Sequence, residues 1–193
     1  MFSLEKSEFR QLLSAVNLRS PFGPRDYILM MFLYHTGLRV GECSGLLVTH
    51  VADLDGLPRH RLHVHATISK GSRGRVIPLN SAAQLCVEKI LRFNRSRGFS
   101  VAPAAPLFQH RKHGPLSVRS MQKLIQRYRV AADLDIPATP HTFRHTHASA
   151  LVAAGASLPA VQRLLGHRQL VSTQIYAHVS EHDLKNAAEL LAK

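Results

Sequence analysis

The chain has 193 residues, 45% of them hydrophobic, which is enough for one large domain with a core and excludes a disordered tail. Lysine and arginine total 25 against 12 acidic residues, a formal charge of +13, which favours a nucleic-acid partner over a ribosomal-type or surface-adhesive role. The lack of tryptophan and the 6% aromatic content argue against a base-stacking platform for single strands.

Helices are predicted for the first quarter of the chain. Residues 4–17 have apolar side chains at helical spacing, and Ser3 can cap them. The prolines and glycine of residues 20–24 end this helix. Residues 25–35 form a second helix that is apolar almost all round and therefore central, and the helix resumes over residues 38–47.

The sequence period then changes from helix to strand. Apolar and polar residues alternate over residues 62–68, as in a half-buried strand. A glycine-rich turn at 69–74 leads to a returning strand at 75–79, and Pro78 places that strand at an edge or an end. With a short strand starting at 53–55, we expect an antiparallel sheet of about three strands.

Helices return in the second half, which makes the predicted fold class α+β and mainly helical, with helices around the small sheet. The helix at 117–132 carries basic residues that form either a solvated face or a phosphate-facing stripe: Arg119, Lys123, Arg127 and Arg129. The other predicted helices cover residues 82–95, 140–151, 157–165, a short segment at 172–176, and 181–192.

Several features predict a soluble intracellular protein. Cys43 and Cys86 each lie in an apolar stretch, as core thiols do, and not in a disulfide or zinc pattern. The N-terminus has no basic segment followed by an apolar one, so a signal peptide is not indicated. The longest apolar run, residues 27–34, is too short to cross a bilayer.

Residues 141–176 hold groups that suit chemistry on a phosphodiester. His141 and Arg144 are three apart on a predicted helix and so share a face. Arginine donates two parallel hydrogen bonds to phosphate oxygens, and His141 or His167 can move a proton. Tyr176 is a candidate nucleophile, but its unperturbed pKa of about 10 means that it needs a positive pocket and a base.

Two residues outside this segment complete the candidate set. A phosphoryl transition state spreads charge over several oxygens, so a second arginine is expected, and Arg39 is the candidate. Glu42, one turn on, can hold its guanidinium, although Arg39 also fits a surface role at a helix start. Lys70, in the hairpin turn, can protonate a leaving oxygen, but turns are often lysine-rich, and Arg73 and Arg75 compete for that role.

Metal binding is the rival interpretation of the histidine-rich segment. His141 and His145 are at i, i+4, and His147 is close by. However, the segment contains no acidic residue in the manner of a zinc hydrolase, and no cysteine pair accompanies it. A metal site is therefore disfavoured.

Five motifs together resemble, in order, the catalytic domain of the tyrosine recombinases, the phage-integrase family. Each motif is weak alone, but five in this order and spacing are highly specific, and they run through nearly the whole chain. They are Thr36-Gly37-Leu38-Arg39-Val40-Gly41-Glu42, Lys70-Gly71 with Arg75-Val76-Ile77-Pro78-Leu79, Pro140-His141-Thr142-Phe143-Arg144-His145-Thr146, Leu164-Leu165-Gly166-His167, and Ile175-Tyr176.

The resemblance implies a site on DNA. Arg39 and Arg144 would clamp the scissile phosphate, and Lys70 would protonate the departing 5′ oxygen. Thr142-Phe143 departs from the family's usual acidic-leucine pair, but Phe143 keeps the apolar anchor. The implied activity is site-specific cleavage and rejoining of double-stranded DNA.

The resemblance also assigns the nucleophile and its helpers. Tyr176 would form a covalent 3′-phosphotyrosyl link, while His141 assists proton transfer from the tyrosine and His167 donates to the phosphate. No metal or nucleotide cofactor is implied, because the phosphotyrosine stores the bond energy.

The resemblance sets expectations for domains and partners. Residues 1–193 would be a catalytic domain, either truncated or naturally single, without the helical N-terminal DNA-binding domain usual in the family, so DNA affinity should be low and salt-dependent. The last helix, within 181–193, would dock on a neighbouring protomer in a dimer or tetramer on DNA. DNA-bending accessory proteins and a bacterial or phage-encoded, cytoplasmic, nucleoid-associated setting are also expected.

Two other functions fit the same residues. A type IB topoisomerase-like enzyme shares the chemistry but religates the same strand, and this chain is short for that class. A regulator that retains the fold would bind DNA without forming a Tyr176 adduct, and the complete set of candidate groups disfavours it.

Overall fold

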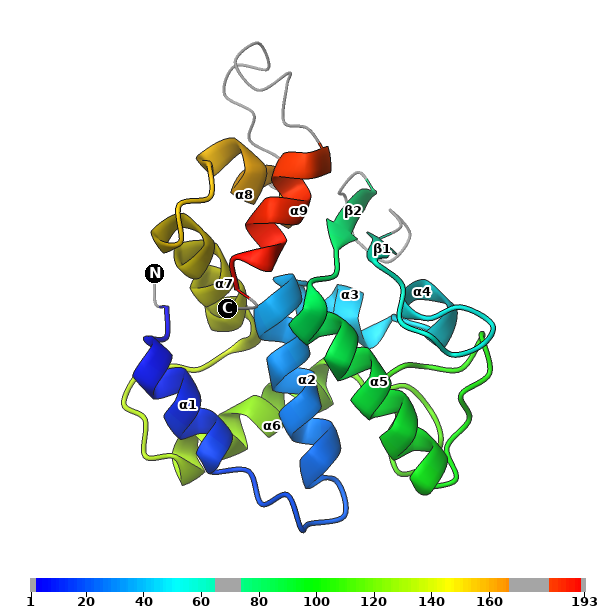
Figure 1. Ribbon diagram of the computed structural model, residues 1–193. Coiled ribbons are helices and arrows are strands. Elements are labelled where there is room, and N and C mark those ends of the chain that lie inside the picture. The colour runs from blue at the N-terminus through cyan, green and yellow to red at the C-terminus, as the bar shows by residue number, and fades with distance from the viewer. Residues whose placement is uncertain (1–2, 65–73, 167–180, 192–193) are drawn as a thin grey trace.

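The computed structural model describes residues 3–64, 74–166 and 181–191 and is mainly helical, with one small sheet at the edge of the helical body beside α4 (Val48–Val51) and α9 (Glu181–Glu189) (Figure 1). None of the described helices is long and apolar enough to cross a membrane. In chain order the elements are α1 (Lys6–Ser14), α2 (Gly23–Thr36), α3 (Val40–Ser44), α4 (Val48–Val51), β1 (Arg61–Val64), β2 (Arg75–Pro78), α5 (Ser81–Ser96), α6 (Val118–Ala131), α7 (Pro140–Ala153), α8 (Leu158–Leu165) and α9 (Glu181–Glu189).

Helix α2 is central, as its apolar sequence predicts. It packs against α5 on one side and α7 on another, and Leu29, Phe32 and Leu33 are fully buried. The helix ends at Gly37, whose φ of 61° lies in the left-handed region that glycine enters without a steric penalty. This ending directs the chain into the turn before Arg39.

The helix predicted over 38–47 is wrong in its extent, because α3 covers only Val40–Ser44 and the next helix, α4, begins at Val48, beyond the predicted range. Arg39 is extended at the start of α3, and its backbone N–H donates to the Glu42 carboxylate at 2.8 Å. Leu47 is also extended and forms a bridge with Pro106, a residue far along the chain. That long-range pairing interrupts the helix.

The sheet has two strands within the described residues, one fewer than expected. β1 and β2 pair antiparallel, with Leu62 opposite Ile77 and Val64 opposite Arg75. The expected strand at 53–55 is instead a turn, in which the Asp53 carboxylate accepts from two backbone N–H groups. Residues 65–73, which include the rest of the predicted strand and its turn, lie outside the described residues.

Two groups of buried side chains hold the fold together. The main core runs from α1 to the start of α7 and includes both cysteines, Cys43 and Cys86, as buried free thiols. A smaller group, here called the satellite cluster, joins the end of α7 to α8 and α9 and consists of Leu151, Ala160, Val161, Leu164, Leu165 and Leu184. Helix α7 therefore belongs to both groups.

Candidate active site

The first turn of helix α7, which carries Arg144 shortly after it, is held by a cap and a proline. The Thr139 hydroxyl accepts from the Thr142 N–H, and Pro140 occupies the first helical turn, where its missing N–H costs nothing. Phe143 is fully buried and meets Phe9 edge-on, with the ring centroids 5.7 Å apart. The apolar anchor expected at Phe143 is confirmed, and it fixes the direction of the neighbouring Arg144.

Arg144 is buried and bonded to two backbone carbonyls. Its Nη1 donates to Gly37 O at 2.8 Å, and its Nη2 donates to Leu165 O. Burial, with the nearby positive charges of Arg39 and Arg75, lowers the pKa of Arg144 to about 9. The guanidinium is thus still protonated at neutral pH and gains from any anion that approaches it.

Arg39 lies beside Arg144 and keeps access to solvent. Its Nη1 forms an ion pair with Glu42 Oε1 at 3.1 Å, and its Nη2 donates to Gly166 O at 3.4 Å. The side chain is 35% exposed, whereas that of Glu42 is only 1% exposed. The sequence-based prediction that Glu42 holds this guanidinium is confirmed, and the alternative of a plain surface residue is not.

Glu42 has a second and shorter partner in Arg75, a role that the sequence analysis missed. The Arg75 Nη1 and Nη2 donate to the two carboxylate oxygens of Glu42 at 2.7 and 2.8 Å. Burial alone would raise the pKa of Glu42, but the hydrogen bonds and charges of Arg75 and Arg39 hold it at about 2. The signal for Arg75 was its strand register, which puts it two residues before buried Ile77 on the same face.

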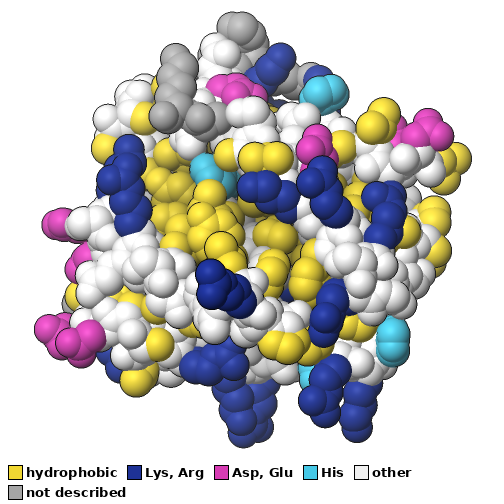
Figure 2. All heavy atoms as spheres, turned by 60° about the horizontal axis from the view of Figure 1, so that its bottom comes forward, with side chains coloured by type: hydrophobic (Ala, Val, Ile, Leu, Met, Phe, Trp, Pro, Cys, Tyr) yellow, Lys and Arg dark blue, Asp and Glu magenta, His cyan; other side chains and the backbone are white. Residues whose placement is uncertain are grey.

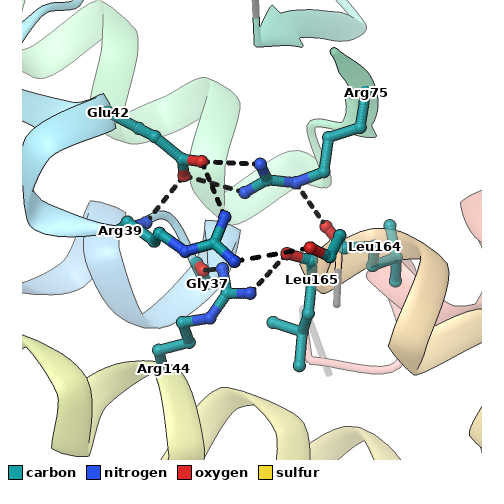
Figure 3. Close-up of polar contacts among 8 residues, drawn as sticks. Gly37, Arg39, Glu42, Arg75, Arg144, Leu164 and Leu165 are labelled. Carbon is teal, nitrogen blue, oxygen red and sulfur yellow. Dashed lines mark hydrogen bonds and ion pairs between the residues drawn. The ribbon is translucent and has the colours of Figure 1, made fainter. Parts of the chain in front are cut away.

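Three guanidiniums and one carboxylate therefore meet at one place (Figure 3). They come from α3, β2 and α7, segments far apart in the sequence. Three positive charges against one negative leave a net charge of +2 on this group. Fixed donors with an excess of positive charge suit the binding of a phosphate and of the charge that develops on it.

The other predicted site residues divide into two groups. His141 is exposed on the first turn of α7, one turn before the buried Arg144. Lys70, His167 and Tyr176 lie outside the described residues, so the structure does not test their placement. Among the residues that the structure describes, no group of three or more histidine, cysteine or acidic side chains could hold a metal ion.

The basic residues of α6 divide into two that bond within the protein and two that are exposed, and the structure does not test whether the exposed pair faces phosphate. Arg127 pairs with the buried Asp26 at 3.0 Å, and Arg129 donates to Leu134 O at 2.8 Å, so these two support the fold. Arg119 and Lys123 are exposed. Figure 2 shows lysine and arginine side chains gathered toward the bottom of one face of the molecule, whereas acidic side chains lie at its left edge and in its upper part.

Comparison with known proteins identifies the family. The sequence model of the phage integrase family matches residues 3–183. The chain belongs to the phage integrase family. Curated relatives include the tyrosine recombinase XerD of Halalkalibacterium halodurans, 32% identical over 184 residues, and the tyrosine recombinase XerC of Bacillus subtilis, 35% identical over 185 residues. Each alignment covers 95% of this chain and 59% of the relative.

Solved structures of phage integrase family members have the same fold. The XerA recombinase matches with a TM-score of 0.70 and 25% identity, over 96% of this chain and 63% of that one. The lambda integrase catalytic core matches with a TM-score of 0.63 and 21% identity, over 86% of this chain and 96% of that one. The predicted class, mainly helical with a small antiparallel sheet, is therefore confirmed.

Proposed function

We propose that this chain cleaves and rejoins double-stranded DNA at specific sites through a covalent 3′-phosphotyrosyl intermediate. The observation that carries the proposal is the meeting of Arg39 and Arg144 beside the carboxylate of Glu42. Membership of the phage integrase family, and relatives named as tyrosine recombinases, support it. The chain spans only 59% of the length of those relatives, so the activity of the whole relatives is a proposal for this chain.

The two arginines would act on the non-bridging oxygens of the scissile phosphate. Each guanidinium is fixed by the protein through part of its donor set and offers the rest to a ligand. Because Arg39 is more exposed than Arg144, it would meet the phosphate first. Donors that are already oriented need no rearrangement as negative charge develops in the transition state.

The remaining steps are proposed for the residues given by the family resemblance. The Tyr176 hydroxyl would attack phosphorus and lose its proton with help from His141, forming the O–P bond while the bond to the 5′ oxygen breaks. Lys70 would supply the proton to that oxygen, and His167 would donate to the phosphate. Attack by a 5′ hydroxyl on the phosphotyrosine reverses the step and releases the tyrosine.

We also propose that the protein assembles on DNA. Similar solved structures include a lambda integrase dimer bound to a core site and a lambda integrase tetramer bound to a Holliday junction. In this chain Leu184 of α9 is buried in the satellite cluster, and we infer that residues 181–193 can instead dock on a neighbouring protomer. The proposed setting is the cytoplasm of a bacterium, at the nucleoid, with DNA-bending proteins as accessory partners.

The central test is covalent trapping of DNA. The protein is incubated with a library of nicked duplexes, and DNA that stays attached after denaturation is sequenced, which reports both the chemistry and the site. We expect Tyr176→Phe to abolish attachment while DNA binding, measured by fluorescence anisotropy, changes by less than about twofold.

The controls separate the competing functions. Tyr128→Phe is the matched control, because this tyrosine is buried, bonds Asp26 and should not affect attachment. Attachment that persists in Tyr176→Phe would refute the nucleophile. Binding without any adduct would favour the regulator, and relaxation of plasmids of any sequence without recombinants would favour the topoisomerase-like enzyme.

A further inference from the structure

The C-terminal end of α8 offers a row of three consecutive backbone carbonyls to three arginines. Leu164 O accepts from Arg75 Nε at 2.8 Å, and Gly166 O accepts from Arg39 Nη2 at 3.4 Å. Leu165 O, between them, accepts from Arg144 Nη2. This carbonyl row, Leu164 to Gly166, therefore aligns the three guanidiniums on one short piece of backbone (Figure 3).

Arg75 differs from the other two arginines in that all three of its guanidinium nitrogens donate to groups of the described residues. Its side chain is 6% exposed, and each of its three guanidinium nitrogens donates to the Glu42 carboxylate or to Leu164 O. The Arg75 side chain also packs closely against Gly166, since a Cβ at position 166 would lie 2.8 Å from the Arg75 Cδ. Arg75 is thus held on both sides by the protein and has little surface exposed to a substrate.

The contacts of Arg75 connect the two supports of Arg39. Glu42 Oε1 accepts from both Arg75 and Arg39, and Leu164, which binds Arg75, is two residues from Gly166, which binds Arg39. Helix α8 packs on β2, so Arg75 also holds the carbonyl row against the strand. Without it, Glu42 would keep only its bonds to Arg39, and Leu164 O would lose its guanidinium partner.

We propose that Arg75 is a positioning residue, which sets the separation of the Arg39 and Arg144 guanidiniums by fixing Glu42 and the carbonyl row together. The catalytic consequence rests on the proposed function, whereas the geometric claim does not. Lysine cannot substitute, because an ammonium is a single point charge and lacks the planar fork that reaches both oxygens of Glu42 and a carbonyl.

The test compares Arg75→Lys with a matched control, Arg25→Lys. Arg25 is also buried, pairs with a neighbouring carboxylate through two nitrogens and donates to a backbone carbonyl, that of Gln109. It lies at the other end of α2, about 18 Å of helix away from Gly37. The control therefore removes a similar set of bonds at a distance from the site.

The first measurement is the side-chain Nε–Hε spectrum of the free protein by NMR, with assignments from single substitutions. We expect Arg75→Lys to shift the Arg39 and Arg144 resonances and Arg25→Lys to leave them in place. Unchanged resonances in Arg75→Lys, or equal changes in both variants, would overturn the positioning role. This measurement decides the geometry even if no DNA adduct forms, in which case only the proposed function fails.

The second measurement is the single-turnover rate of adduct formation on a nicked duplex recovered by trapping, at a temperature where both variants are folded. We expect Arg75→Lys to slow adduct formation by about 10- to 100-fold, because small misplacements of catalytic groups have effects of this size. DNA affinity should change by less than about threefold, and Arg25→Lys should keep the wild-type rate. A wild-type rate in Arg75→Lys would contradict the proposal.

Discussion

Gly37 contributes to the positions of both Arg144 and Arg39. Its carbonyl accepts from Arg144, and its φ of 61° lets the chain leave α2 toward Arg39. A Cβ at this position would lie 2.5 Å from Cδ2 of the buried His147. Any side chain here would therefore meet both backbone strain and a rigid neighbour.

We predict that Gly37→Ala lowers the free energy of unfolding by about 3 kcal/mol, from left-handed strain together with overpacking. Urea denaturation measures this change. Gly41→Ala is the control, because a Cβ there meets nothing within 4 Å and the residue lies in α3. The control should change stability by less than about 1 kcal/mol, toward greater stability; equal losses in both variants would contradict the steric argument.

Residues close in sequence were the predictable part of the site. Arg39 and Glu42 are three apart at a helix start, so their contact followed from helix geometry. The pairing of Glu42 with Arg75 joins segments 33 residues apart. The predicted strand places Arg75 on the same face as Ile77, but only the folded core brings that face against Glu42.

At the scale of elements, Asn80 connects the start of α5 to α9. Its side-chain oxygen accepts from Ala83 N at 2.9 Å, which caps α5, and its Nδ2 donates to Ala188 O at 2.7 Å. The residue is almost completely buried. One amide therefore serves two helices, with its acceptor on one and its donor on the other.

Replacing the Asn80 amide with a carboxylate tests the contact with α9 while keeping the cap of α5. Asn80→Asp keeps the cap of α5 but places an oxygen against Ala188 O, and we expect a loss of about 2 kcal/mol in unfolding free energy. Hydrogen exchange of the α9 amides should also become faster. Ser117→Ala, which removes the exposed cap of α6, should cost about 1 kcal/mol without affecting α9; unchanged α9 exchange in Asn80→Asp would refute the connection.

Most helices were predictable because apolar spacing and caps agree with the final packing. Residues 140–151 and 157–165, for example, match α7 and α8 closely. The break between α3 and α4 was not predictable, since it comes from the pairing of Leu47 with Pro106. The prediction of a strand at 53–55 was wrong for a local reason, because hydrogen bonds to the Asp53 carboxylate favour a turn.

For the whole molecule, two buried histidines predict how stability depends on pH. Burial lowers the pKa of His35 to about 4 and that of His147 to about 4, so both are neutral in the folded protein. His147 Nδ1 donates to Tyr34 O at 2.7 Å, while His35 Nδ1 has no hydrogen-bond partner among the described residues. Below pH 6.5 the unfolded chain binds protons that the folded chain does not.

We therefore expect the free energy of unfolding to fall by about 2 kcal/mol per histidine as pH drops from 7 to 4.5. The depressed pKa of Glu42, about 2, affects stability mainly below this window. Urea titrations at several pH values measure the slope. His147→Asn keeps a donor for Tyr34 O and should reduce the slope by about half; an unchanged slope would show that His147 is not the proton acceptor.

The division of buried side chains into a main core and a satellite cluster affects the temperature up to which the site keeps its geometry. The main core holds Arg39 and Arg144 through α2 and α7, whereas the carbonyl row belongs to α8 in the satellite cluster. Small packing units open more readily than a whole domain. Warming should thus separate α8 and α9 from the main core first, so the proposed strand cleavage should be lost some degrees below the melting temperature of the whole protein.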